Sequence, residues 1–141
     1  MSLRTKPILL IEDNQTDKNN IECALETMQV KSQLVHSSNS NEALNYLRDQ
    51  DSKKPWLILL GLNAQSPDGF DFLKAIKSDD NLKIIPIVIV AESHEDQKIV
   101  QGFEFGVSGY IVKPKDRSKI DNTIKTIMDY WTLSELPPSR G

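Results

Sequence analysis

Residues 56–70, WLILLGLNAQSPDGF, contain the pattern that decides the fold. Residues 57–60 form an unbroken apolar run that ends at Gly61, which is typical of a parallel strand buried on both faces. Pro67-Asp68-Gly69 then favours a turn, and apolar residues recur at helical spacing over residues 70–76. The stretch therefore predicts a strand, a loop and a helix. Because ligands bind beyond the carboxyl ends of parallel strands, a reacting group is expected at Gly61, which has no side chain.

The same alternation extends over the rest of the chain. Segments with helical spacing of apolar residues separate five predicted strands, at residues 8–11, 33–36, 57–60, 87–90 and 110–112. This alternation predicts an α/β chain: a flavodoxin-like, doubly wound, five-stranded parallel sheet with five helices. Right-handed crossovers leave few topologies, and the strand order 2-1-3-4-5 is the commonest at this size. In that order the carboxyl ends of strands one and three lie side by side.

Two of the predicted helices have clear sequence signals. Asn39, with Glu42 three residues later, predicts a capping box at the start of the second helix. The last helix begins near Arg117 and has the cleanest amphipathic pattern in the chain, in Ile120, Ile124, Ile127, Met128 and Trp131. The second strand is the most polar of the five, which favours an edge position in the sheet.

Length and composition limit the function classes. The 141 residues suffice for one domain with its own core, and we expect it over residues 4–133, with a flexible tail over residues 134–141. The net charge of −3 argues against a nucleic-acid role. A single cysteine, Cys23, and the lack of a long apolar segment or a leader argue against a disulfide framework, membrane insertion and secretion. A cytoplasmic chain is expected.

Four motifs stand at the predicted strand ends: ILLIEDN at residues 8–14, LILLGLNAQSPDG at 57–69, PIVIVAES at 86–93 and GYIVKP at 109–114. In these motifs, which occur in order over nearly the whole chain, the sequence resembles the receiver domain of bacterial response regulators. The resemblance implies the 2-1-3-4-5 order and a role in two-component phosphorelay signalling. In the family, an aspartate at the end of strand three accepts a phosphoryl group from phosphohistidine, and magnesium neutralises the phosphoryl oxygens.

The resemblance also assigns roles to residues of this chain. It implies that Glu12, Asp13 and the main-chain carbonyl of Asn63 are magnesium ligands. Lys113 matches the lysine that pairs with the phosphoryl group, and the Lys113–Pro114 peptide bond matches one that is usually cis in the family. Tyr110 matches the aromatic residue that swings inward when the domain is phosphorylated.

Two positions depart from the family pattern, and both remove chemistry. Gly61 stands where the family has its phosphoacceptor aspartate, and glycine cannot be a nucleophile. Ala91 stands where the family has a threonine or serine whose hydroxyl binds the phosphoryl group. We therefore expect a pseudo-receiver, which docks partners independently of phosphorylation, has no enzymatic activity, and retains a weak or empty remnant of the magnesium site.

Two alternative functions, an enzymatic receiver and a ligand-binding protein, belong to classes other than a docking module. A receiver with autocatalytic turnover is conceivable if an unconventional residue, Asp68 or Ser66, accepts the phosphoryl group. The simpler interpretation of Asp68 is that it forms the turn and caps the third helix. A flavodoxin-like ligand binder is a poor match, because the loop after the first strand is acidic rather than a glycine-rich phosphate cradle.

The resemblance and the remaining residues predict contacts and partners. We expect Lys113 to form an ion pair with Asp13, so that a salt bridge replaces the metal. The expected partners are a histidine kinase, a phosphotransfer protein or an output protein. The sequence is similar in character to phytochrome-associated single-domain regulators, so a homodimer is expected through the face of helix four, strand five and helix five, where the apolar residues are Phe103, Phe105, Val107, Trp131 and Leu133.

Overall fold

A five-stranded parallel sheet forms the centre of the computed structural model, which describes residues 6–62, 69–92 and 95–133. The strands run in the order β2-β1-β3-β4-β5, and every neighbouring pair is parallel. The predicted α/β class and strand order are therefore confirmed. The strands are β1 (Ile8–Ile11), β2 (Leu34–Ser37), β3 (Leu57–Leu62), β4 (Ile87–Ala91) and β5 (Gly109–Val112).

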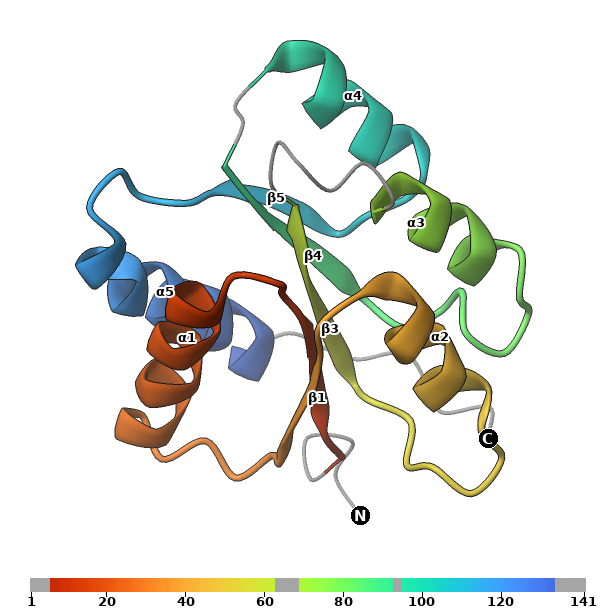
Figure 1. The fold of residues 1–141 in the computed structure, drawn as a ribbon, viewed down its shortest axis with the longest axis horizontal. Helices are drawn as coiled ribbons and strands as arrows, with labels where there is room; N and C mark the ends of the chain where they lie inside the picture. The colour runs from red at the N-terminus through yellow and green to blue at the C-terminus, as the bar shows by residue number, and fades with distance from the viewer. Residues whose placement is uncertain (1–5, 63–68, 93–94, 134–141) are drawn as a thin grey trace.

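Helices cover both faces of the sheet (Figure 1). Helices α1 and α5 lie together on one face, and α2, α3 and α4 lie on the other. Among the described residues, no helix is long and apolar enough to span a membrane. The helices are α1 (Gln15–Thr27), α2 (Ser40–Arg48), α3 (Gly69–Lys77), α4 (Asp96–Glu104) and α5 (Ile120–Leu133), the last preceded by a 3-10 turn at Arg117–Lys119.

Two hydrophobic clusters, one on each side of the sheet, make up the core. Successive residues of a strand point to opposite faces, so Leu9 and Ile11 join the cluster under α2 and α3, whereas Ile8 and Leu10 join the cluster under α1 and α5. The five apolar residues predicted to form one face of the last helix are all buried in the second cluster. Burial on both faces explains why the central strands are continuously apolar.

The position of β2 in the sheet and the start of α2 both agree with the predictions from the sequence. Strand β2 lies at one edge and is mostly half-buried. The Asn39 side chain accepts a hydrogen bond from the Glu42 backbone N–H at 2.9 Å, and the Glu42 carboxylate accepts one from the Ser38 backbone N–H at 2.8 Å. The predicted cap of α2 therefore forms, with the return hydrogen bond one residue before the cap.

Strand β3 is longer than the sequence indicates. It continues through Gly61 to Leu62, and these residues pair with Val90 and Ala91 of β4. The expectation that the strand ends at Gly61 was wrong, because the ladder to β4 and the burial of Leu62 extend it. Gly69 begins α3 directly over Leu62, and an added Cβ at residue 69 would collide with the leucine side chain.

The backbone after β5 differs from the family resemblance. No peptide bond of the described residues is cis, so the Lys113–Pro114 bond is trans. The two isomers of an X–Pro bond differ little in free energy, and a motif match alone therefore does not decide between them.

Candidate functional site

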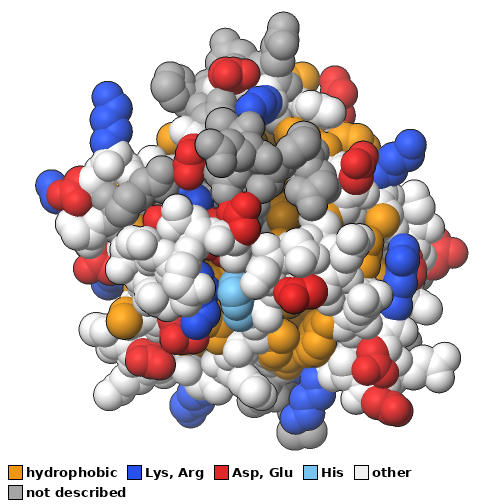
Figure 2. Space-filling view, viewed as in Figure 1, with side chains coloured by type: hydrophobic (Ala, Val, Ile, Leu, Met, Phe, Trp, Pro, Cys, Tyr) orange, Lys and Arg blue, Asp and Glu red, His pale blue; other side chains and the backbone are white. Residues whose placement is uncertain are grey.

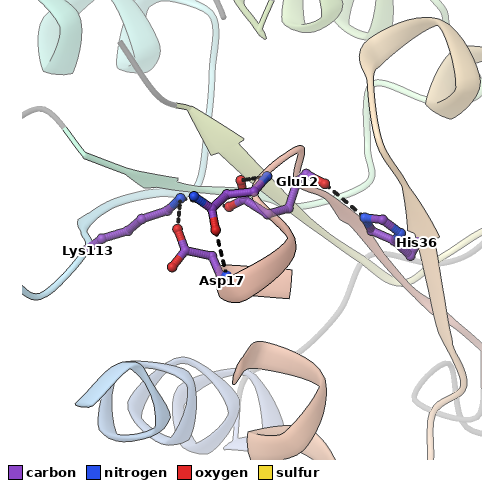
Figure 3. Close-up of polar contacts among 5 residues, drawn as sticks. Glu12, Asp17, His36 and Lys113 are labelled. Atoms are coloured by element: carbon purple, nitrogen blue, oxygen red, sulfur yellow. Dashed lines mark hydrogen bonds and ion pairs between the residues drawn. The ribbon is translucent and has the colours of Figure 1, made fainter. Parts of the chain in front are cut away.

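The carboxyl ends of β1 and β5 bring Glu12 and Lys113 together, with Asp17 from the first turn of α1 (Figure 3). The Lys113 Nζ atom lies 2.8 Å from Glu12 Oε1 and 2.8 Å from Asp17 Oδ2. The three side chains are almost completely inaccessible, at 0%, 1% and 2% exposure for Lys113, Glu12 and Asp17. We call Glu12, Asp17 and Lys113 the buried triad.

Backbone contacts hold each member of the buried triad in place. The Lys113 backbone N–H donates to the Ala91 carbonyl at 2.6 Å, which ties the end of β5 to β4. The second oxygen of the Glu12 carboxylate accepts a hydrogen bond from the Asn14 backbone N–H at 3.2 Å. The Asn14 side chain in turn accepts from the Asp17 backbone N–H at 2.9 Å and caps α1. On the other side, His36 Nε2 and the Glu12 carbonyl oxygen lie 2.9 Å apart.

Burial makes the buried triad sensitive to the loss of its cation. Desolvation raises the pKa of the Glu12 carboxyl above its ordinary value of 4.5, although the Lys113 ammonium and the Asn14 N–H act in the opposite direction. Removing one partner of a buried ion pair typically costs about 3–5 kcal/mol, because the remaining charge has lost both water and its counter-charge. Two carboxylates here depend on a single ammonium group.

The side chain of Glu12 lies directly against Gly61. A Cβ atom added at residue 61 would lie 2.5 Å from Glu12 Oε1 and 2.9 Å from the Ile11 carbonyl oxygen. No Cβ fits at these distances, so Glu12 and the Ile11 carbonyl must both shift before residue 61 can carry a side chain. A small hollow of ≈ 60 Å³ remains beside Glu12, Asp13 and Gly61, far below the size of an ordinary small-molecule pocket.

The magnesium ligands implied by the family resemblance fit this arrangement poorly. Gly61 contributes no carboxylate, and both oxygens of Glu12 are already engaged by Lys113 and by the Asn14 N–H. Within residues 6–62, 69–92 and 95–133, no group of three or more acidic, histidine or cysteine side chains could hold a metal ion. Asp13 is exposed, and Asn63 lies outside the described residues, as do the alternative acceptors Ser66 and Asp68.

The partner of Lys113 differs from the expected one. An ion pair with Asp13 was predicted, but the ion pairs of the ammonium group are with Glu12 and Asp17. Sequence reasoning missed Asp17. Its signal was its position, because residue 17 falls on the same helical face as Ile21, Ala24 and Leu25, all of which are buried. An acid on an apolar face requires a buried partner.

The two positions that the resemblance assigns to the switch, Ala91 and Tyr110, both contact the cluster under α2 and α3. Ala91 is fully buried there, and the half-buried Tyr110 ring packs against the same cluster. Burial and the negative charge of Glu95 raise the pKa of the Tyr110 hydroxyl. In the sheet, Tyr110 pairs with Ile89, and Ala91 pairs with Val112.

The surface predicted for dimerisation is only partly as expected. Val107 and Trp131 are buried in the core and contribute no free surface, because the sheet and α1 cover them. Phe105 is half-buried against Phe70, and nothing is described of the Leu133 side chain. Large apolar side chains that are exposed include Val100 and Phe103 of α4 and Val112 of β5.

The charged side chains do not separate by sign on the face drawn in Figure 2. Lysine and arginine side chains are interspersed with aspartate and glutamate over the described part of that face. This mixture agrees with the small net charge of −3.

Comparisons with known proteins give one consistent result. Residues 8–125 match the family model of the response regulator receiver domain. The response regulator Rcp1 of Synechocystis is 30% identical over 130 residues, which cover 89% of this chain and 88% of Rcp1. The crystal structure of the phosphorylated cyanobacterial phytochrome response regulator RcpA is similar with a TM-score of 0.87 at 34% identity, over 96% of this chain and 99% of that one. The Mn²⁺-bound form of Rcp1 has a TM-score of 0.86 at 30% identity, over 94% and 99% of the two chains.

Proposed function

The chain belongs to the response regulator receiver domain family, and from this premise we propose that it is a pseudo-receiver of a two-component phosphorelay. It docks signalling partners without being phosphorylated on residue 61. The proposed receiver covers residues 4–133, and the predicted tail, residues 134–141, lies outside the described residues. The proposal of a single-domain regulator is supported by Rcp1 and RcpA, of whose lengths the alignments cover 88% and 99%. A cytoplasmic location is part of the same proposal.

The observation that carries the proposal is the contact between Glu12 and Gly61. Residue 61 has no nucleophile, and the buried Glu12 carboxylate lies where the first atom of any side chain at that position would be. The second loss, at Ala91, removes the hydroxyl that the family uses to bind the phosphoryl group. Both losses argue against signalling by phosphorylation. Without a carboxylate at residue 61 no acyl phosphate forms there, and without a hydroxyl at residue 91 no side chain at that position binds a phosphoryl group.

The structures of relatives bear on the metal site. Rcp1 has been solved in a Mn²⁺-bound form. For this chain we propose a weak or empty site at Glu12, Asp13 and Asn63, because Lys113 and the Asn14 N–H engage the Glu12 carboxylate. The chain then functions without a required cofactor.

Incubation with acetyl phosphate and magnesium, followed by intact-mass measurement, tests the proposed function. We expect no added phosphoryl mass, since residue 61 has no carboxylate to attack phosphorus. A phosphoryl adduct that disappears in Asp68→Ala or in Ser66→Ala would replace the pseudo-receiver by a receiver with an unconventional acceptor. An aspartate-accepting receiver of the same family is the positive control for the phosphodonor.

The proposed partners are a histidine kinase, a phosphotransfer protein or an output protein, and a second copy of the chain. Receiver domains interact with signalling proteins of this kind. The proposed homodimer uses the face of α4, β5 and α5, where Val100, Phe103 and Val112 are exposed by 55%, 51% and 39%. Exposed apolar side chains gathered on neighbouring elements are typical of an interaction surface.

Self-association should depend on Phe103. We expect Phe103→Ser to raise the dissociation constant of the homodimer about tenfold or more, because truncating a central aromatic side chain removes a large share of the binding free energy. Sedimentation equilibrium measures the constant. Asn45→Ser, at an exposed position of α2 near the opposite edge of the sheet from β5, is the control and should leave it unchanged. Equal dimerisation of the two variants would contradict the proposed interface.

A further inference from the structure

The site around Gly61 already contains a cation that belongs to the protein. We propose that the Lys113 ammonium group is the resident cation of the site, held by Glu12 and Asp17 in place of a divalent metal ion. This inference rests on the proposed function, since a domain that is never phosphorylated at residue 61 does not need a metal to accept a phosphoryl group.

The geometry of the buried triad supports the proposal that the Lys113 ammonium group replaces a divalent metal ion. A divalent ion needs several oxygen ligands, and the carboxylates nearest to Gly61 supply the strongest of them. Glu12 offers one oxygen to the ammonium at 2.8 Å and the other to the Asn14 N–H at 3.2 Å. A metal ion bound to Oε1 would compete with the ammonium group for the same oxygen, and one bound to the other oxygen would lie beside its positive charge.

Asp17 makes the arrangement more than a single ion pair. Its carboxylate lies 2.8 Å from the same ammonium nitrogen, so that Lys113 is held from β1 and from α1 at once. A lysine that has lost nearly all its water and faces two carboxylates does not leave easily. A metal ion entering the site would meet this charge, which repels it.

Gly61 completes the arrangement. Without a Cβ at residue 61, the Glu12 side chain can lie across β3 and reach Lys113. Gly61 therefore leaves open the space that the Glu12 side chain occupies in the buried triad. The absence of a side chain at residue 61 thus removes both the nucleophile and one carboxylate ligand for a metal ion.

Removing the ammonium group should convert the site into a metal site. Lys113→Met keeps most of the side-chain length but leaves Glu12 and Asp17 as two buried carboxylates without their cation. We expect the melting temperature of this variant to fall by about 10 °C or more in EDTA and to rise saturably with millimolar Mg²⁺ or Mn²⁺. The wild-type protein should show neither a metal-dependent melting temperature nor a change in tryptophan fluorescence over the same range.

The double variant Lys113→Met/Asp17→Asn is the matched control. It lacks the same ammonium group but also one of the two acids, so metal ions should raise its melting temperature much less than that of Lys113→Met. A saturable rise in the wild type, or equal rises in the two variants, would overturn the inference. If Lys113→Met does not fold in EDTA, the metal titrations of the wild type and of the double variant still test the inference.

The failure of this inference is separable from the failure of the proposed function. A wild-type protein that binds Mg²⁺ yet gains no mass with acetyl phosphate would contradict the resident cation alone. A wild-type protein that gains a phosphoryl group would contradict the pseudo-receiver as well.

Discussion

Gly61→Asp is expected to destabilise the protein, although it introduces the residue type that the resemblance to the family implies for this position. The new side chain would enter space that Glu12 occupies, since even its Cβ would lie 2.5 Å from Glu12 Oε1. Overpacking of this kind costs about 1–3 kcal/mol, and a further carboxylate beside a single ammonium group adds to it. We therefore expect the free energy of unfolding to fall by about 3 kcal/mol or more in the absence of divalent ions, as measured by urea denaturation.

Two matched variants separate the causes of this loss. Gly61→Ala adds the Cβ without the charge and should cost about 1–3 kcal/mol. Glu12→Ala/Gly61→Asp removes the carboxylate that occupies the space and should be more stable than Gly61→Asp alone, because residue 61 can then pair with Lys113. Phosphoryl acceptance by Gly61→Asp should be only partial, since Ala91 still has no hydroxyl. A Gly61→Asp protein as stable as the wild type in EDTA would show that Glu12 moves aside freely.

Phe72→Ala is the second substitution with a large expected effect. Phe72 is 1% exposed and is among the largest fully buried side chains, between α3 and the sheet. Replacing a buried phenylalanine by alanine removes its transfer free energy and leaves a cavity, which together cost about 3–5 kcal/mol. Urea denaturation of the variant should show a lower midpoint with an unchanged slope.

Phe70→Ala is the control for Phe72→Ala, two residues away on the same helix. Phe70 is half-buried, and its ring centroid lies 6.1 Å from that of Phe105. We expect a loss of about 1 kcal/mol, chiefly from that aromatic contact. A larger loss for Phe70 than for Phe72 would mean that α3 turns its other face to the core.

Part of the packing of α3 could be predicted from the sequence, and part could not. The helical spacing of apolar residues over residues 70–76 predicted α3 but did not fix which of them face the core. The structure buries Phe72, Leu73 and Ile76, with Phe70 at the margin. Residues 70 and 72 lie about 200° apart around a helix, so only one of the two phenylalanines can lie at the centre of the buried face, and the packed chain places Phe72 there.

The site shows the same division. The family resemblance predicted that Glu12, Asp13 and Lys113 belong to one site at the carboxyl ends of the parallel strands, and the structure brings Glu12 and Lys113 together there. The choice of Glu12 and Asp17 over Asp13 as partners of Lys113 was not predictable. It depends on which carboxylates α1 and β1 bury, and burial is a property of the packed chain.

The sequence by itself determined the class of fold, the edge position of β2, the buried face of α5 and the loss of a nucleophile at residue 61. These follow from local periodicity and from the chemistry of single residues. Only the tertiary structure decided that Gly61 lies inside β3, that Glu12 crosses it, and that Asp17 holds Lys113 from α1. Such contacts join residues that are far apart in the chain, and their geometry depends on how helices and strands pack together.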